Sequence, residues 1–396
     1  MEVHLQEWLE LSLRWAHLTV GIAWIGASFY FNWLENRLIR QQSVNPSIEG
    51  DLWAIHGGGF YHVQKYEVAP DELPAQLHWF KWEAYFTWFT GLALLALIFY
   101  GNANVYLLDQ SVAQLAPWQG ITIGVATLAI SWIFYDLMCR SAFAERHLLL
   151  ALIIFTYFCL LAILLCNTFS GRGAYIHVGS AIGTVMVLNV MAVIVPSQKS
   201  LVRAMQTGGE RDAALGRAGL TRSRHNNYLT LPVLFIMISS HYPSTFSSSW
   251  NWLILIGIAV AGIVVRHYFN VRHLPGTKWW LLLVGAGIFV LIVLMTLPES
   301  RPTLDTVKSV SIENVRSVIH ERCTVCHSAA PVRTEFQVAP GGIVMDTDEQ
   351  INTLASRIYT TTVATRSMPI GNLSQMTEAE RQLIGNWYTQ LGKAAQ

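Results

Sequence analysis

Long apolar runs recur through the first three quarters of the chain, separated by polar segments. Most are about 20 residues long, which is the length that an α-helix needs to cross roughly 30 Å of hydrocarbon. The sixth run is shorter and contains Pro232, so we expect its helix to be kinked or to begin earlier. None has the polar face of a helix in a soluble core. The pattern predicts an all-α, polytopic membrane bundle with about eight spans, at 11–31, 80–100, 117–138, 148–166, 174–195, 228–241, 252–271 and 279–297.

The polar segment after the first predicted span is long enough for structure of its own. Leu52–His56 and Phe60–Val68 are rich in residues that favour strands, and they flank three consecutive glycines at 57–59. Strand-forming runs around a glycine turn predict a β-hairpin.

After residue 297 the pattern becomes that of a soluble helical domain. Pro298–Thr306 is a polar linker that contains two prolines, and a helical pattern follows from Val307 to about Glu321. We therefore divide the chain into a transmembrane helical domain at 1–297, a linker at 298–306 and a C-terminal domain at 307–396.

Charge is scarce and unevenly distributed. Only 13% of the 396 residues are charged, against the roughly 25% that is usual in soluble proteins. The last 99 residues contain nine Lys or Arg and ten Asp or Glu, so the deficit lies in the first 297 residues. This composition excludes a disordered protein and most soluble enzymes, and a net charge of +1 gives no field that would attract a nucleic acid.

The positive charges also predict an orientation. Fourteen Lys and Arg lie in the connections 32–79, 139–147, 196–227 and 266–278, whereas the connections 101–116, 167–173 and 239–251 contain only Arg172. Because cytoplasmic connections carry the excess of Lys and Arg, we predict that the first set is cytoplasmic and that both termini lie outside. Glu2, Glu7 and Glu10 precede the first span in place of the positive segment of a signal peptide.

The C-terminal domain contains the sequence C-x-x-C-H, formed by Cys323, Cys326 and His327. This is the attachment sequence of c-type haem, in which both cysteines bind the porphyrin and the adjacent histidine binds the iron. A zinc site or a disulfide is the alternative. Zinc needs about four ligands, and the other three cysteines lie in or beside predicted spans. The sequence therefore predicts one covalent haem c.

A methionine or a second histidine should complete the iron coordination. Met368 lies in a loop before a proline, where its side chain can point at a haem face, and Met345 is the alternative. Met376 precedes Thr377, which we expect to cap the last helix together with Glu380. The order of C-x-x-C-H, Met-Pro loop and aromatic final helix resembles a class I cytochrome c. That resemblance implies attachment outside the cytoplasm, as the charge distribution does.

Ionisable residues inside a bilayer are costly and point to function. Asp136 and Arg140 have the spacing of an ion pair, which we interpret as structural. Histidines at one depth suit the ligation of a haem b or the binding of an organic substrate, and the pattern does not distinguish the two. An outer set comprises Arg14, His17, Arg172, His177 and His241. An inner set comprises His78, Glu83, Asp136, Arg140, His147, His225 and His267.

Four segments of the membrane block carry a family resemblance. They are Arg14–His17, Trp24–Gly26, Trp82–Tyr85 and Arg222–Asn227. With the fused C-terminal cytochrome c, they resemble the bacterial integral-membrane, cytochrome c-linked urate oxidases. The resemblance implies an oxidoreductase of purine degradation in the bacterial inner membrane, with the N-terminus and the cytochrome c domain in the periplasm. It implies oxidation of urate to 5-hydroxyisourate, with electrons passing through haem c to the respiratory chain and no hydrogen peroxide formed.

The electron acceptor implied by the resemblance is external, such as a terminal cytochrome oxidase or a soluble cytochrome c. For the substrate site we predict Arg14, His17 and His177 as clamp and base, because an outer site lies close to haem c. A site on the inner side would need an intervening redox group. The alternatives are a quinol-oxidising or other respiratory membrane subunit, an anchored electron shuttle and a transporter.

Overall fold

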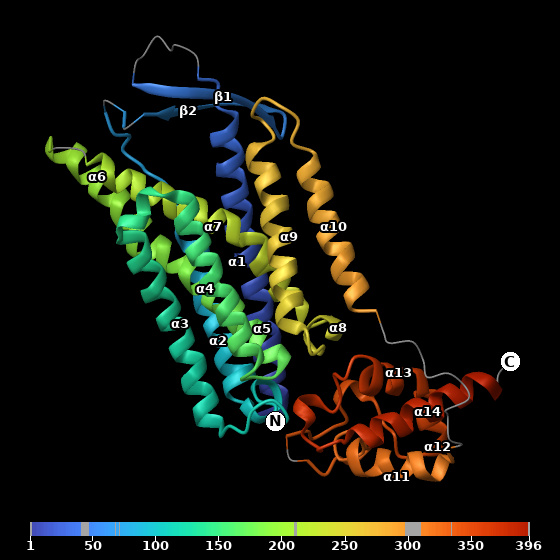
Figure 1. Cartoon of the computed structure of the whole chain (residues 1–396). Helices are drawn as coiled ribbons and strands as arrows, with labels where there is room; N and C mark the ends of the chain where they lie inside the picture. Colours follow the sequence, from blue (N-terminus) through green and yellow to red (C-terminus); the bar gives the residue numbers. More distant parts are fainter. Residues whose placement is uncertain are drawn as a thin grey trace.

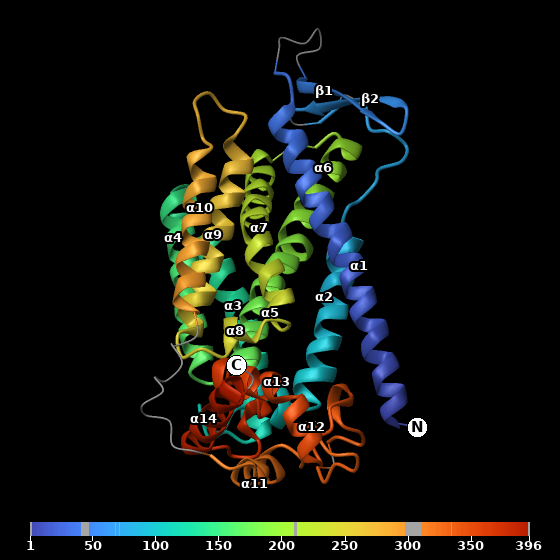
Figure 2. The same ribbon diagram turned by 90° about the vertical axis from the view of Figure 1, so that its right-hand side faces the viewer.

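The computed structural model describes residues 2–40, 47–67, 69–70, 72–209, 212–297, 310–333 and 335–394. An N-terminal helical bundle is followed by a smaller helical C-terminal domain that packs against one end of it (Figure 1). The β-hairpin lies at the opposite end of the bundle (Figure 2). The linker predicted at 298–306 lies outside the described residues, as do Val307 and Val68, which the sequence places at the edges of predicted elements.

Among the described residues, five helices are long and apolar enough to cross a membrane. They are Trp82–Tyr100, Pro117–Arg140, His147–Cys166, Gly171–Thr207 and Asn251–Val271. Five of the predicted spans lie in them, which fits a membrane protein. The other three predicted spans lie in α1, α7 and α10, and for these helices crossing stays a prediction. The long helices are α1 (Glu2–Arg37), α2 (Trp82–Leu94), α3 (Pro117–Arg140), α4 (His147–Cys166), α5 (Gly171–Leu188), α6 (Val195–Thr207), α7 (Ala213–Ser239), α9 (Asn251–Val271) and α10 (Trp280–Met295).

Two helices continue through π-helical turns. η1 (Leu95–Tyr100) extends α2, and η4 (Asn189–Ile194) joins α5 to α6. α7 contains Pro232 and begins well before the predicted span, so the expectation of an earlier start is confirmed.

α5 lies at the centre of the bundle. It packs against α2, α3, α4 and α7, and small side chains on it allow close approach. Ala174 and Ala181 are fully buried, and a Cβ at Gly179 would lie 2.5 Å from the Ile236 side chain of α7. The hydrophobic core of the bundle forms around this helix. Removing such side chains from water is the main stabilising contribution in a soluble core, whereas close packing dominates inside a bilayer.

The predicted hairpin is confirmed. β1 (Ile48–His56) pairs antiparallel with β2 (Gly59–Tyr66), and the turn residues Gly57 and Gly58 have φ angles of 57° and 80°. Glycine adopts these angles without the clash that a Cβ would cause. Lys65 fixes the hairpin to α1, since its Nζ lies 2.8 Å from the Glu35 carboxylate.

The C-terminal domain is built from α11 (Ile312–Arg322), α12 (Asp348–Thr353), α13 (Ala355–Tyr359) and α14 (Glu378–Ala394). α14 begins at the predicted cap: the Glu380 carboxylate accepts from the Thr377 N–H at 2.6 Å. Met376 is buried in the core of the domain, next to Trp387.

The two domains meet where η2 (Ala103–Leu107), a π-helical turn of the bundle, packs against η8 (Ile370–Asn372), a short 3₁₀ turn of the C-terminal domain. Gly371 makes the closest approach. Its φ is 53°, and a Cβ there would lie 2.8 Å from the carbonyl oxygen of Leu108. Only glycine fits both the angle and the distance.

Candidate functional site

The C-terminal domain encloses a cavity of about 280 Å³. Its lining brings together the residues that the sequence singles out: Cys323, Cys326, His327, Met345 and Met368. The motif lies at the end of α11, where the helix ends at Arg322 and the chain turns. The Met368 loop lies more than 40 residues further along the chain, so the fold assembles this cavity from distant segments.

His327 is oriented by the backbone. Its Nδ1–H donates to the carbonyl oxygen of Ile343 at 3.1 Å, so the lone pair of Nε2 is free for a metal. Burial lowers the pKa of His327, which keeps the ring neutral near pH 7. Burial raises the pKa of the Cys323 thiol to about 12 and also raises that of Cys326. Both cysteines are free thiols.

The residues around this motif do not form a zinc site. Across the described parts of the chain, no group of three His, Cys, Asp or Glu side chains is arranged to hold a metal ion. Zinc needs three or four such ligands, so the alternative of a zinc site has no support.

Two arginines position the Met368 loop. Arg381, which is buried, donates to the carbonyl oxygens of Thr362 and Met368, the latter at 2.9 Å. Arg322, directly before the motif, donates to the Ser374 carbonyl oxygen at 2.9 Å. Charge-assisted bonds of this kind are stronger than neutral ones, so they hold the loop across the cavity from α11.

The bundle contributes to the same cavity. Tyr106 of η2 and Arg172 of α5 line it, although both belong to the other domain. The Arg172 guanidinium lies over the rings of Tyr106 and Phe246, at 5.9 Å and 5.3 Å from their centroids. Arg172 is a member of the predicted outer set, so this part of the set lies directly at the domain junction.

Of the three residues predicted as clamp and base, Arg14 and His17 lie in the N-terminal half of α1, and His177 lies in the second turn of α5. The N-terminal end of α1 lies on the side of the bundle that holds the C-terminal domain (Figure 1). Arg14 is 54% exposed and is 3.8 Å from the Glu10 carboxylate. The Nδ1 of His17 is 3.0 Å from both the Thr87 carbonyl oxygen and the Thr90 hydroxyl, which joins α1 to α2.

His177 is fully buried in α5. Its Nδ1–H donates to the Gly173 carbonyl oxygen at 2.8 Å, and its Nε2 lies 3.2 Å from the Tyr100 hydroxyl. A Cβ at Gly124 would come within 2.6 Å of Nε2, so the ring needs glycine on α3. No hydrogen bond or ring contact between His177 and Arg14 or His17 occurs in the described residues.

A buried polar network lies at the hairpin end, and sequence analysis recognised only part of it. Asp136 pairs with Arg140 at 2.7 Å, as predicted, and also with Arg222 of α7 at 2.7 Å. Arg222 is 4% exposed and donates to Asn189 at 3.0 Å. Asn189 donates in turn to Asn226 at 2.9 Å.

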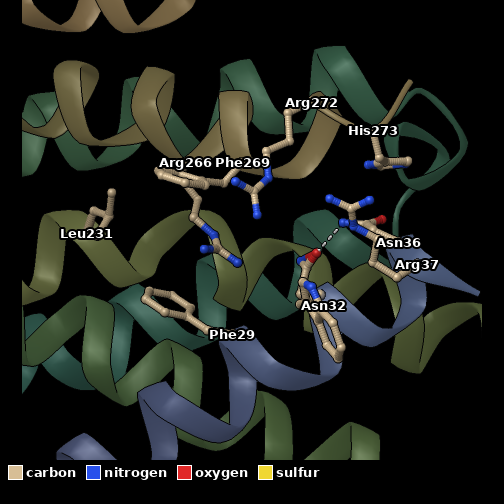
Figure 3. A pocket seen from close by; sticks show the side chains of 10 residues that line it. Phe29, Asn32, Asn36, Arg37, Leu231, Arg266, Phe269, Arg272 and His273 are labelled. Atoms are coloured by element: carbon tan, nitrogen blue, oxygen red, sulfur yellow. Dashed lines mark hydrogen bonds between the residues drawn. The ribbon is translucent and has the colours of Figure 1, made fainter. Parts of the chain in front are cut away.

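A second cavity, of about 270 Å³, lies next to this network between α1, α7 and α9 (Figure 3). Arg266 of α9 lies 93% buried at its side, and its Nε donates to Asn227 at 2.9 Å. In the sequence, Arg266 counts only as a marker of orientation. The sequence signal that could have indicated this region is the polar stretch Arg222–Asn227. Its Arg222 and Asn226 belong to the network, and its Asn227 contacts Arg266.

Comparison with known proteins gives one family. Residues 3–297 match the sequence profile of the family described as urate oxidase N-terminal. The match ends at the last residue of the bundle before the C-terminal domain. No curated protein and no solved structure matches the chain significantly.

Proposed function

Because the chain belongs to the urate oxidase N-terminal family, we propose that it oxidises urate to 5-hydroxyisourate and passes the electrons to a haem c held in its C-terminal domain. One observation carries the proposal: the cavity lined by Cys323, Cys326, His327 and Met368 opens onto Tyr106 and Arg172 of the family's own domain. An electron acceptor at this junction would lie next to the bundle.

The residues present fit this group. Cys323 and Cys326 would form the thioethers, and His327 would bind iron through Nε2. Met345 donates its N–H to the His327 carbonyl oxygen at 2.9 Å, so it belongs to the histidine side of the cavity. Met368 comes from the other loop and would be the sixth ligand. When bound, the haem would accept electrons one at a time.

The reaction balances without oxygen as a reactant. Urate and one water give 5-hydroxyisourate, two protons and two electrons. A base must take a proton from the attacking water, and a cation must hold the anionic ring. We propose Arg14 for the clamp, with His17 and His177 for proton transfer. His177 would act through the Tyr100 hydroxyl, which lies 3.2 Å from its Nε2.

The orientation that we propose is multi-pass in a bacterial inner membrane, with the C-terminal domain in the periplasm. In the sequence, the connections 32–79, 139–147, 196–227 and 266–278 contain fourteen Lys and Arg, whereas the opposite connections contain only Arg172. The β-hairpin belongs to the first of these connections and lies at the end of the bundle remote from the C-terminal domain (Figure 1). The C-terminal domain packs at the other end (Figure 1), which is the outer end by the positive-inside rule. An acceptor such as a terminal cytochrome oxidase or a soluble cytochrome c would then receive the electrons.

The decisive experiment is anaerobic addition of urate to the purified, oxidised protein. We expect the absorption bands of haem c to become those of the reduced form, because no other oxidant is present. Oxidised protein that stays oxidised with urate would contradict the proposal. A quinol added in a parallel sample tests the alternative of a respiratory subunit, which also predicts a second α-band from haem b.

The same assay tests the proposed site residues. Alanine at Arg14, His17 or His177 should abolish or strongly slow reduction of the haem by urate, while dithionite should still reduce it. If urate reduces all three variants at the wild-type rate, the outer site is wrong.

A further inference from the structure

The cavity at the hairpin end has the chemistry of an anion site. Arg37, Arg266, Arg272 and His273 line it, and no carboxylate is among the lining residues. None of these three arginines makes an ion pair within the described residues. Figure 3 shows Arg266 of α9 and Arg272, the residue directly after α9, reaching toward the same space. Like charges that converge without a counter-ion repel each other, so an anion between them would stabilise the arrangement.

Arg266 is held in place for this role. It is 93% buried, its Nε donates to the Asn227 Oδ1 at 2.9 Å, and its guanidinium lies 4.1 Å from the centroid of the Phe29 ring. The terminal nitrogens are left for another partner, since no protein acceptor for them occurs among the described residues. A buried guanidinium with no carboxylate is costly.

The layer behind Arg266 is also incompletely paired. Asn270 donates to the same Asn227 oxygen at 2.9 Å, so that one oxygen accepts two bonds. The Nδ2 of Asn227 and the Oδ1 of Asn270 are buried and have no partner. Buried polar groups are normally satisfied. Neither Asn227 nor Asn270 is among the residues that line the cavity, so these two atoms belong to the layer that holds Arg266 and are not contacts for a ligand.

The walls of the cavity favour a flat ligand. Phe29, Trp33 and Phe269 supply aromatic side chains, and the Arg266 and Arg272 guanidiniums lie over the Phe29 and Phe269 rings, at 4.1 Å and 5.1 Å from their centroids. The amides of Asn32 and Asn36, joined by a hydrogen bond of 2.7 Å from the Asn36 Nδ2, supply a further donor and acceptor. The cavity of about 270 Å³ is close to the lower end of the roughly 300–1,000 Å³ that small-ligand pockets occupy. It suits a small molecule better than a lipid chain. Guanidinium forks match the paired oxygen and nitrogen edges of a heterocycle.

We propose that this cavity between α1, α7 and α9 binds a flat organic anion of the chemical class of urate, at the end of the bundle remote from the C-terminal domain. The choice of urate itself rests on the proposed function. The same cationic chemistry would also accept inorganic phosphate or an anionic lipid headgroup, but neither of these uses the aromatic walls.

The test is equilibrium dialysis of radiolabelled urate against the full-length protein reduced beforehand with dithionite, so that no turnover consumes the ligand. We expect Arg266→Gln to weaken one class of urate sites about tenfold or more, since a charged hydrogen bond is lost. Arg272→Gln is the second variant, because Arg272 is exposed and its loss does not endanger folding. Arg203→Gln removes an exposed cation from α6 at the same end and should leave binding unchanged.

Two further arms separate the sources of the anion. Inorganic phosphate at high concentration, or nanodiscs rich in phosphatidylglycerol, should not displace urate from the wild-type protein. If phosphate or the phosphatidylglycerol nanodiscs displaced urate, the cavity would be a site for phosphate or for a lipid headgroup, and the proposal of a flat organic anion would be wrong. Unchanged urate binding in both Arg266→Gln and Arg272→Gln would overturn the site. That result would not contradict the proposed oxidation of urate. Conversely, a wild-type protein that binds urate in this cavity without oxidising it would contradict the proposed oxidation and support the binding site.

Discussion

Asp136 shows how burial decides what a charged partner contributes. Its carboxylate accepts from Arg140 and from Arg222, each at 2.7 Å, but the Arg140 side chain is 65% exposed and that of Arg222 only 4%. An exposed pair gains little over hydration, whereas removing one partner of a buried pair leaves an uncompensated charge. We therefore expect the two ion pairs of Asp136 to contribute unequally to stability, although their N–O distances are equal.

The prediction compares two leucine variants. Arg222→Leu should lower the free energy of unfolding by roughly 3–5 kcal/mol, because Asp136 loses its buried partner and the Asn189 Oδ1 loses its donor. Arg140→Leu, the matched control, should lower it by less than about 1 kcal/mol. Denaturation of the purified protein in detergent measures both. Similar losses in the two variants would show that burial is not the deciding factor.

The two methionines of the cavity give a second comparison of residues. Met368→His should lower the reduction potential of the proposed haem, because a methionine ligand raises the potential relative to a histidine ligand. Met345→Leu keeps a similar volume and should leave the potential unchanged, although Met345 lines the same cavity. A redox titration followed at the haem bands measures both. A shift in Met345→Leu alone would assign the ligand to Met345.

For single residues, the sequence predicts sites whose members are adjacent in a short motif. It does not predict sites whose members come together only when distant helices pack. Cys323, Cys326 and His327 are recognisable because their chemistry needs adjacent positions. Arg266 and Asn227 are 39 residues apart and meet only because α7 packs against α9. Hydropathy treats Arg266 as a charge near the end of a span, and periodicity carries no information about which cavity an arginine lines.

At the scale of elements, apolar runs predicted the helices well because helix length and hydrocarbon thickness are linked. The boundaries were less predictable. α7 begins at Ala213, in a polar stretch that hydropathy cannot assign to a span. The π-helical turns η1, η2 and η4 have no sequence signature, yet η2 forms the contact with the C-terminal domain.

That contact yields a prediction about glycine. Gly371→Ala introduces a Cβ at a φ of 53° and within 2.8 Å of the Leu108 carbonyl oxygen, whereas Gly342→Ala introduces one at a φ of 66° with nothing within 4 Å. Both variants carry the strain of a left-handed residue, about 1–2 kcal/mol. Only Gly371→Ala should also loosen the domain junction.

Limited proteolysis between the domains, together with thermal unfolding, distinguishes the two variants. We expect faster cleavage and an additional loss of stability in Gly371→Ala, and only the loss from strain in Gly342→Ala. Equal cleavage rates in both variants would show that Gly371 is not needed for the junction.

For the whole molecule, charge distribution and motif predicted the two kinds of domain but not how they meet. One cavity lies between α1, α7 and α9, and the other lies at the domain junction. The hairpin and the C-terminal domain lie at opposite ends of the bundle (Figure 1). The positions of the cavities follow from packing between segments that are far apart in sequence. Arg172 shows the difference. The sequence marks it as the only Lys or Arg in the connections predicted to lie outside, and in the fold it lines the cavity of the C-terminal domain.

The junction at Gly371 and Arg172 has a consequence for the proposed transfer of electrons to an external acceptor. In the proposed reaction, a C-terminal domain held against the bundle by backbone contact would pass electrons on from a fixed position and would not swing on a flexible linker. The electron acceptor must therefore diffuse to the C-terminal domain, either within the plane of the membrane or through the surrounding water. The rate of electron transfer to the acceptor would then depend on the concentration of the acceptor and on the ionic strength, as it does for any diffusional association between two molecules.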